Sequence, residues 1–521
     1  MRIYLRNLAW ILPVSLGVGL LLSLLDGGTF WIGLLAYSLI TFIGLVILYA
    51  INRSAGVSRV MGIILLLTIF FRVGLGMAFS YILPPNSNGN EALSAGYIFR
   101  DSFTRDTQAW KLASSSESLW SAFDKSTSSD QYGGMLFISA ALYRFLSPDS
   151  HRPWLVILVG ALTSAMGVII AWKAVRKIWG EPLAWGTAWI MALFPESILL
   201  GSAQMREPFL ITFVVMVFWG VVCWSENRLV SAAWLAGGIA GMLLFSPGIA
   251  IAAIIITALW VWIREKGSVV VRWWWIVAVA AVTILATFLF IGAVGGSLLV
   301  KDGPIQSLLN WFRYSAQWDA YLLKLNSGWI QNVFNSLPAF LHFPFIIGYG
   351  VMQPVLPAAV ADPATWPMRA LGILRGLGWY ALLPLLVYSF RSILKIPEKR
   401  ERFAWLWLLI MTWGWIILSS VRAAGDQWDN PRYRVVFLFF QAALVAQAII
   451  WQRASKDRWL WRFLEVEGVF LVFFGYWYAA RYTGWLAGQV HVFVIISLIV
   501  IISIVILVGG WISDRRRIRR A

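Results

Sequence analysis

Apolar segments of membrane-spanning length recur along almost the whole chain, and they restrict its fold more than any other feature. Of the 521 residues, 60% are hydrophobic and only 13% are charged, whereas soluble domains carry about 25% charged residues. Within a bilayer every backbone polar group needs a partner from the chain itself, so membrane spans are built from helices or closed barrels. Apolar runs of about 20 residues predict helices. The expected fold is an all-α polytopic membrane protein.

The apolar runs are numerous enough for about 14 transmembrane helices. The first, within Met1–Leu25, follows a basic start and lacks a clear cleavage site, so we expect an uncleaved span. Another segment, Leu337–Pro357, is apolar but interrupted by proline, which is typical of a re-entrant or interfacial helix. The expected spans start near Leu8, Phe30, Val60, Trp154, Leu183, Pro208, Leu229, Gly248, Trp273, Gly372, Phe403, Val435, Trp459 and His491.

Two long polar loops divide these helices. In the first, Pro84–Pro153, the apolar runs stop and charged residues take their place. We expect amphipathic helices within both loops. The predicted organisation is N-terminal spans at 1–83, a first large loop at 84–153, a transmembrane core at 154–295, a second large loop at 296–370 and C-terminal helices at 371–521.

The basic residues predict the orientation. The formal net charge of +18 sits largely in short loops between spans, so the positive-inside rule explains it better than nucleic acid binding does. Placing both termini in the cytoplasm puts most basic loops and the tail Asp514–Ala521 inside. We expect a multi-pass protein of the cell (inner or plasma) membrane. The segments facing outward are then 84–153, 204–207, 296–370 and 423–434, together with His151, His342 and His491.

Several chemistries lack their signatures. The sequence contains no Walker loop, dinucleotide fingerprint or His-Glu-x-x-His motif, and its single cysteine, Cys223, rules out an internal disulfide. The inner loops are too short for a nucleotide-binding domain, so energy must come from an activated substrate or an ion gradient. No metal-binding constellation is clear, and no cofactor is certain, although a divalent metal stays open. The 33 Trp are expected mainly in interfacial belts.

Two aspartates of the first outer loop are candidate catalytic groups. Asp101 and Asp106 lie in the segment 99–110. If Thr107–Ala113 is helical, Asp106 lies near the helix N-terminus, where the dipole favours a carboxylate. A helix cap is the simpler interpretation of Asp106 taken alone, and a catalytic role needs other evidence.

Other charged residues gather on the same predicted face. Glu207 lies in a tight turn before Pro208, and it either pairs with Arg206 at the interface or has a functional role. Near the helix expected from Val435, several guanidinium groups favour a phosphate site over a mutually neutralising rim. The residues of that region are Arg422, Asp426, Asp429, Arg432 and Arg434.

Two charged residues fall inside the expected spans. Arg72 lies in the third span, where it either snorkels to the interface or faces a polar cavity. Glu196 follows a proline kink, and structural packing and cavity lining are equally compatible with its position.

The segment from Asp130 to Phe218 resembles the core of the GT-C superfamily of membrane glycosyltransferases, which includes protein O-mannosyltransferases and the lipid A aminoarabinose transferase. The resemblance rests on the first-loop segment Asp106–Ala113, on Arg432-Tyr433 before a late helix, and on an acidic residue at Glu207. The chain departs from the family in having three spans before the catalytic loop, no adjacent Asp-Glu pair in that loop, and Gly133-Gly134 near the usual Pro-Pro. The other matching motifs are 132–138, 142–146, 175–180, 192–195 and 202–207.

The resemblance implies transfer of a sugar from a polyprenyl phosphate or pyrophosphate to an acceptor hydroxyl on a glycan, lipid or protein, at the outer face of the membrane. A carboxylate would accept the hydroxyl proton, and arginines would hold the phosphate. The partners implied are this lipid-linked donor, the acceptor and membrane lipids, with no nucleic acid. The roles implied are Asp106 as base with Asp101 as second choice, Glu207 assisting, Arg432, Arg434, Arg422 and Arg206 as phosphate ligands, and Tyr433 and His342 as substrate-loop residues.

Other functions share part of this pattern. A flippase or transporter of lipid-linked glycans is compatible with a large helical bundle, but it should show charged or broken helices at mid-membrane and an internal repeat. Arg72 is the main charge expected there, and the two halves show no obvious repeat. A polysaccharide polymerase or ligase at the outer face shares the donor and differs in the acceptor, and an assembly subunit without activity is a fourth hypothesis.

Overall fold

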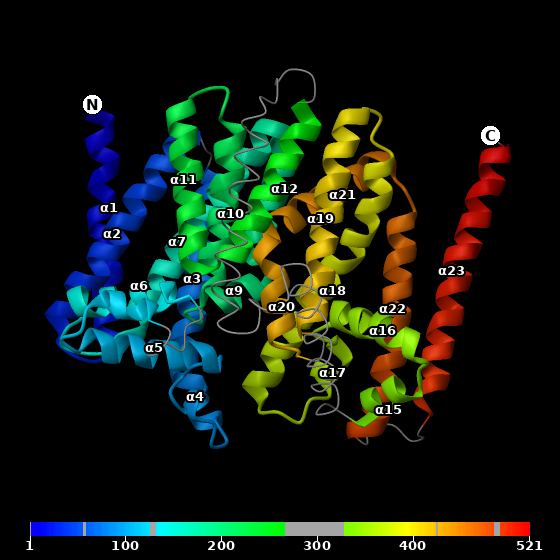
Figure 1. Cartoon of the computed structure of the whole chain (residues 1–521), viewed down its shortest axis with the longest axis horizontal. Helices are drawn as coiled ribbons and strands as arrows, with labels where there is room; N and C mark the ends of the chain where they lie inside the picture. Colours follow the sequence, from blue (N-terminus) through cyan, green and yellow to red (C-terminus); the bar gives the residue numbers. More distant parts are fainter. Residues whose placement is uncertain are drawn as a thin grey trace, which may run out of the picture. The chain divides into compact units, whose positions relative to one another are not determined.

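The protein is helical throughout its described part, and no strand occurs there. The chain forms two compact units, residues 1–300 with 435–442 and residues 301–434 with 443–521. The computed structural model (Figure 1) describes residues 2–55, 59–124, 132–265, 328–423, 426–483 and 490–520.

The first unit contains long apolar helices joined by short turns, and a group of short helices between its third and fourth long ones. The short helices are η1 (Pro84–Asn86), α4 (Glu91–Ser94), α5 (Arg100–Ala113), η2 (Leu119–Phe123) and α6 (Gly134–Leu146), with η3 (Val435–Phe437) from later in the chain. The other helices are α1 (Arg2–Leu25), α2 (Phe30–Ala55), α3 (Arg59–Ile82), α7 (Pro153–Trp179), α8 (Glu181–Leu193), α9 (Pro195–Gly201), α10 (Glu207–Val222), α11 (Arg228–Phe245) and α12 (Pro247–Glu265).

The second unit also consists of helices in its described part. Its α16 is apolar but only 14 residues long, which is too short to cross a bilayer, as expected for Leu337–Pro357. The helices are α15 (Gly328–Ser336), α16 (Ala339–Met352), α17 (Leu356–Val360), α18 (Trp366–Leu394), α19 (Lys399–Ala423), α20 (Asp429–Arg434), α21 (Leu438–Ser455), α22 (Trp459–Tyr478), the π-helical turn η4 (Ala479–Thr483) and α23 (Val492–Arg520).

The helices confirm a polytopic helical membrane protein. In the described ranges, 10 helices are long and apolar enough to cross a membrane, or 11 if the bent pair α8–α9 counts as one span. The described ranges therefore contain fewer spans than the expected number of about 14 transmembrane helices. The apolar stretches Ala9–Leu25 and Glu207–Val222 are shorter than the spans counted, and the segment expected from Trp273 lies outside the described residues.

Helix α7 forms the centre of the first unit because it is apolar on every side. Of its membrane-length window, 83% is buried within the protein, as expected for a helix without a polar face. Its C-terminus is capped by Gly180, whose φ of +93° is open to glycine and disfavoured for other residues. This residue turns the chain sharply into α8.

A break divides the span formed by α8 and α9. Phe194 is extended because Pro195 follows it, and the two helices meet at 52°. Glu196 lies in the first turn of α9 and is 3% exposed. The break leaves carbonyl groups at the end of α8 without their usual helical donors.

Arg72 supplies donors at this break. From α3, its guanidinium donates to the carbonyls of Met191 (3.4 Å) and Ala192 (3.2 Å) and to Ser197 Oγ (2.8 Å). A side chain on Gly201 would collide with Arg72, since a Cβ there would lie 2.6 Å from Arg72 Cδ. Arg72 therefore does not snorkel to the interface, because it is 1% exposed and its terminal nitrogens donate to the carbonyls of a broken helix inside the unit.

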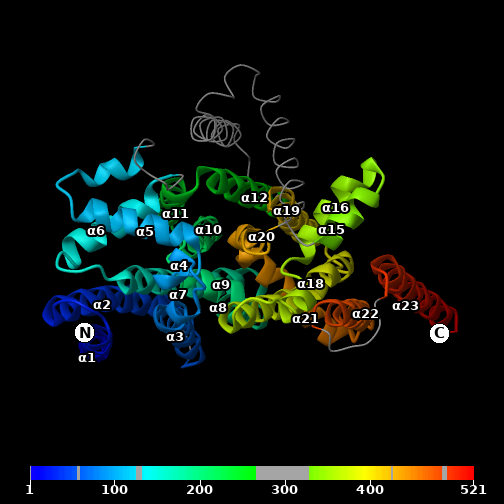
Figure 2. The ribbon, with the colours of Figure 1, turned by 90° about the horizontal axis from the view of Figure 1, so that it is seen from below.

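Helices α5 and α6 lie across one end of the long helices of the first unit. In Figure 1 they lie at the end opposite the N-terminus, and Figure 2 shows this end directly. The two short helices pack against each other. The basic residues Arg176 and Lys177 lie in the last turn of α7, at the other end of the unit.

Replacing Arg72 by Met should lower the stability of the protein by about 2–4 kcal/mol, because the carbonyls of Met191 and Ala192 lose a buried donor. Ser197→Ala removes a single hydroxyl partner and should cost only about 1 kcal/mol. Thermal unfolding in detergent, followed by tryptophan fluorescence at one scan rate, measures both changes. An unchanged apparent Tm for Arg72→Met would contradict this account of the break.

Candidate active site

Asp106 lies in the middle of α5, on the face that packs into the first unit. The helix begins at Arg100, several residues before the expected start, so Asp106 does not cap it and the interpretation as a cap is wrong. The side chain is 2% exposed. A buried carboxylate is stable only when hydrogen-bond donors surround it.

Three side chains surround this carboxylate, and with it they form the Asp106 cluster. The Tyr97 hydroxyl donates to Oδ2 at 2.5 Å, and the Tyr143 hydroxyl donates to Oδ1 at 2.5 Å. His151 Nε2 lies 2.8 Å from Oδ2. The donors come from the α4–α5 connection, from α6 and from the loop before α7, so three separate segments converge on one buried acid.

The two phenols act as permanent donors. Burial raises the pKa of Tyr97 and of Tyr143 well above the usual value of tyrosine, and the negative charge of Asp106 adds to the effect. Both hydroxyls therefore keep their protons at neutral and moderately alkaline pH. Both oxygens of Asp106 are engaged throughout this range.

His151 is the member of the cluster that reaches solvent. Its side chain is 30% exposed, compared with 1% for Asp106. In the neutral tautomer with its proton on Nε2, the ring donates to Asp106 Oδ2 and Nδ1 is the nitrogen with the lone pair. The hydrogen bond of the His151 ring found among the described residues is the one through Nε2.

Aromatic rings fix the orientation of this imidazole. The Trp110 ring stacks on it, with centroids 5.3 Å apart, and the Tyr143 ring meets it edge-on at 5.0 Å. Trp110 lies one helical turn after Asp106 on α5. The ring is thus held on the same side of the helix as the carboxylate that it contacts.

Arg144 locks α5 to α6. Its guanidinium donates to four carbonyl groups at or just beyond the C-terminus of α5, where a helix lacks internal donors. This clamp fixes the helix that carries Asp106 against the helix that carries Tyr143. The acceptors are Leu112 (2.5 Å), Ala113 (3.3 Å), Ser115 (3.1 Å) and Glu117 (2.8 Å).

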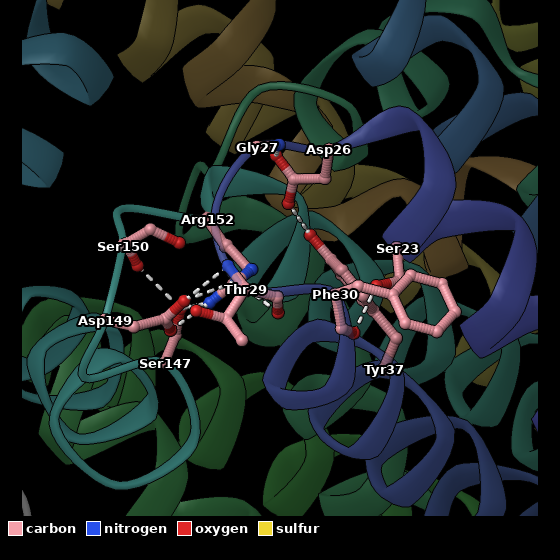
Figure 3. A network of polar contacts seen from close by, with 10 residues as sticks. All are labelled: Ser23, Asp26, Gly27, Thr29, Phe30, Tyr37, Ser147, Asp149, Ser150 and Arg152. Carbon is pink, nitrogen blue, oxygen red and sulfur yellow. Dashed lines mark hydrogen bonds and ion pairs between the residues drawn. The ribbon is translucent and has the colours of Figure 1, made fainter.

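A second network anchors the loop that carries His151 (Figure 3). The neighbouring Arg152 is 1% exposed and pairs with Asp149 at 2.5 Å. It also donates to Thr29 O (3.0 Å), while Thr29 N donates to Asp149 Oδ2 (2.8 Å). Gly28 permits this approach, since its φ is +89° and a Cβ there would lie 2.1 Å from Ser150 Oγ. The turn between α1 and α2 therefore holds the His151 loop.

Glu207 is connected to the Asp106 cluster through the preceding turn. Arg105 Nη1 donates to Gln204 O at 3.5 Å, and Gln204 Nε2 donates to Pro153 O at 3.1 Å, two residues after His151. Glu207 is 1% exposed and begins α10, with Pro208 in the first turn as expected. Arg206 Nε lies 3.9 Å from Glu207 Oε1. The first loop and this turn thus meet, as the sequence predicts.

The rival candidate Asp101 does not share the cluster. It is exposed in the first turn of α5, and five residues separate it from Asp106. This separation turns the two side chains about 140° apart around the helix axis. Of the two carboxylates, Asp106 is the one that faces the interior.

The second unit contains the other predicted site residues. Arg432 pairs with Asp429 at 3.0 Å, as in the mutually neutralising arrangement, and Arg434 lies over the Trp379 ring at 3.4 Å. Asp426 accepts from the backbone of Asp429 (2.9 Å) and so starts α20. A phosphate role for these arginines stays a prediction.

The remaining predicted residues of this unit serve local contacts. Arg422 is exposed in the last turn of α19, and Tyr433 O accepts from Trp415 Nε1 at 2.9 Å. His342 Nε2 lies 3.0 Å from Leu337 O, and its ring stacks on Phe334 at 4.1 Å.

The sequence reasoning missed three members of the cluster. The sequence pattern puts His151 on the outer face but indicates no role for it, and it contains no signal for Tyr97 or Tyr143. In the second unit it also missed Arg375, which is 3% exposed and lies over the Trp428 ring at 4.4 Å. The available signal for His151 is a titratable side chain two residues before the proline that starts α7.

Within the described residues, no group of three or more His, Cys, Asp or Glu side chains is placed to hold a metal ion. No protein-family model and no curated protein matches the chain.

Asp149→Asn should destabilise the protein by about 2–3 kcal/mol at neutral pH, because it leaves the buried Arg152 without its charged partner. The hydrogen bond from Arg152 holds the pKa of Asp149 well below its usual range. A carboxyl with a lowered pKa in the folded state stabilises above its unfolded pKa, and this contribution fades as the pH falls through the folded value. The difference in apparent Tm between wild type and variant should be constant from about pH 5 to 8 and shrink below about pH 4. A difference that grows on acidification would contradict the assignment.

Proposed function

We propose that the protein is a glycosyltransferase that moves a sugar from a polyprenyl phosphate or pyrophosphate to an acceptor hydroxyl at the extracytoplasmic face of the cell membrane. The observation that carries the proposal is the contact between the buried Asp106 carboxylate and the partly exposed His151 imidazole. The pair lies in the loop where the resemblance to GT-C enzymes expects an essential carboxylate.

The sidedness follows from the charges of the first unit. The ends of its helices away from the Asp106 cluster carry Arg176 and Lys177 on α7 and Arg264 on α12. Basic residues beside spans favour the cytoplasm. These charges support an outward position for the end with α5 and α6, where a lipid-linked sugar is a suitable donor because no nucleotide is needed.

In the proposed step, the acceptor hydroxyl oxygen bonds to the anomeric carbon of the sugar while the bond from that carbon to the phosphate oxygen breaks. The hydroxyl proton passes to Nδ1 of His151, and the phosphate leaves with the bonding electrons. Asp106 holds the imidazole in the tautomer with a proton on Nε2 and stabilises the imidazolium that forms. Two phenols already engage Asp106, so we assign it a positioning role in place of the base role that the resemblance implies.

A phosphate contact in the first unit is assigned to Arg206. Its side chain is 14% exposed and its guanidinium lies 5.5 Å from the centre of the Tyr132 ring. A guanidinium beside a helix N-terminus suits an anionic group. The phosphate roles of Arg432, Arg434 and Arg422 rest on the resemblance alone.

The transporter hypothesis depended on a charge inside the membrane. Arg72 is that charge, and its contacts with Met191, Ala192 and Ser197 account for its position. The break between α8 and α9 is a broken helix of the kind that a flippase should show. Arg72 donates to the carbonyls at this break, and the sequence has no obvious internal repeat, so we favour the enzyme. A polymerase or ligase would use the same donor and step with another acceptor.

Asp106→Asn and His151→Gln should each lower sugar transfer by about 10²–10⁴-fold, the usual contribution of general base catalysis. The matched control is Asp101→Asn, the same change on the exposed side of α5, which should keep most of the activity. Transfer of a radiolabelled hexose from polyprenyl phosphate to host membranes, with each variant at equal abundance, measures the effect. Full activity of both cluster variants, or loss in the Asp101 variant alone, would refute this centre.

The division of roles between the two residues has its own test. Added imidazole should restore a large part of the activity of His151→Gly, because it replaces the proton acceptor. It should leave Asp106→Asn unchanged, since the imidazole ring is still present there. If imidazole rescues neither variant, or rescues both to the same extent, His151 is not the base.

A further inference from the structure

A cavity of about 720 Å³ opens in the second unit where α21 ends, α22 begins and α23 passes beside them. It shares no residue with the Asp106 cluster. Its polar side is formed by Arg453, Lys456, Arg458 and Arg462, with Glu465 as the acidic member. The cavity therefore has a positive lining.

One of these cations has a structural partner. Arg462 makes two hydrogen bonds to Asp514, at 2.6 and 2.8 Å, and these join α22 to α23. Trp459 Nε1 donates to the same carboxylate at 2.9 Å. This arrangement forms one wall, while the exposed side chains of Arg453 and Arg458 are available to an anion.

Most of the remaining lining of the cavity consists of small and apolar residues. Gly510 lets Arg462 pass, since a Cβ there would lie 2.4 Å from Arg462 Nε, whereas a Cβ on Gly509 would meet nothing within 4 Å. Ile506 and Trp461 also line the cavity. Further along α23, Ile504 and Val505 are 54% and 64% exposed, so an apolar helix face extends away from the charged opening.

The same end of the unit carries other basic segments. Arg391, at the end of α18, pairs with Asp457 at 2.6 Å, which places the α18–α19 connection beside the α21–α22 connection. Basic connections of this kind mark the cytoplasmic side, and the cytoplasmic leaflet is rich in anionic lipids.

We propose that this cavity binds the phosphate headgroup of an anionic phospholipid, with the acyl chains lying along the apolar face of α23. Guanidinium groups suit phosphate oxygens because they present paired donors. The apolar face of α23 continues from the cavity. The acyl chains of a lipid would cover this face, whereas a soluble phosphate would leave it unused. This site is independent of the proposed glycosyl transfer.

Phospholipid binding to the purified full-length protein in detergent, measured by native mass spectrometry, tests the site. Phosphatidylglycerol should bind more tightly than phosphatidylcholine, and inorganic phosphate and glycerol 3-phosphate should compete weakly. Arg453→Gln/Arg458→Gln should weaken phosphatidylglycerol binding by about 30-fold, or about fivefold for each basic side chain. The matched control is Lys399→Gln/Arg400→Gln, an equal charge change on the neighbouring connection, which should leave binding nearly unchanged.

A second variant tests the cavity without changing charge. Gly509→Phe should fill the space and remove phosphatidylglycerol binding, whereas Gly468→Phe is the control, because Gly468 is also open within 4 Å but does not line the cavity. Unchanged binding in both Arg453→Gln/Arg458→Gln and Gly509→Phe would overturn the proposal. Equal loss in the two double variants would also overturn it, and binding of inorganic phosphate as tight as that of the lipid would refute a lipid ligand.

Discussion

The first unit depends on the need to satisfy a charge away from water. Asp106 is buried among apolar helices, and an unpaired carboxylate there would be strongly destabilising. Its two oxygens accept from Tyr97, Tyr143 and the His151 ring. These donors come from separate segments, so the position of one acid constrains α5, α6 and the loop before α7 together. The geometry of the candidate site and the stability of this end of the unit have the same cause.

The first two helices, α1 and α2, help to hold the candidate site in place. The chain has three long helices before the first polar loop. The turn between the first two contacts the His151 loop through Thr29, Asp149 and Arg152. An ion pair of a buried arginine tolerates little movement of its partners. Helices α1 and α2 thus support a loop that lies far from them in the sequence.

The sequence was sufficient to predict the features that depend on a local pattern of residues. Long apolar runs predicted most helices, and Pro208 correctly predicted the start of α10. It missed the start of α5, because Arg100–Asp106 is polar and looks like a loop until α6 covers its buried face. The roles of Arg72 and His151 were not predicted for another reason. Their partners lie 119–125 and 45 residues away, and a single sequence contains no signal for contacts of that separation.

The Arg72 contacts have a consequence for how the site is spaced. They join α3 to the junction of α8 and α9, deep within the first unit. The polar loop that leads to Asp106 leaves from the end of α3, and the turn that leads to Glu207 leaves from the end of α9. One guanidinium therefore joins the two elements from which both surface segments depart, so the two halves of the candidate site start from a common junction inside the helical layer.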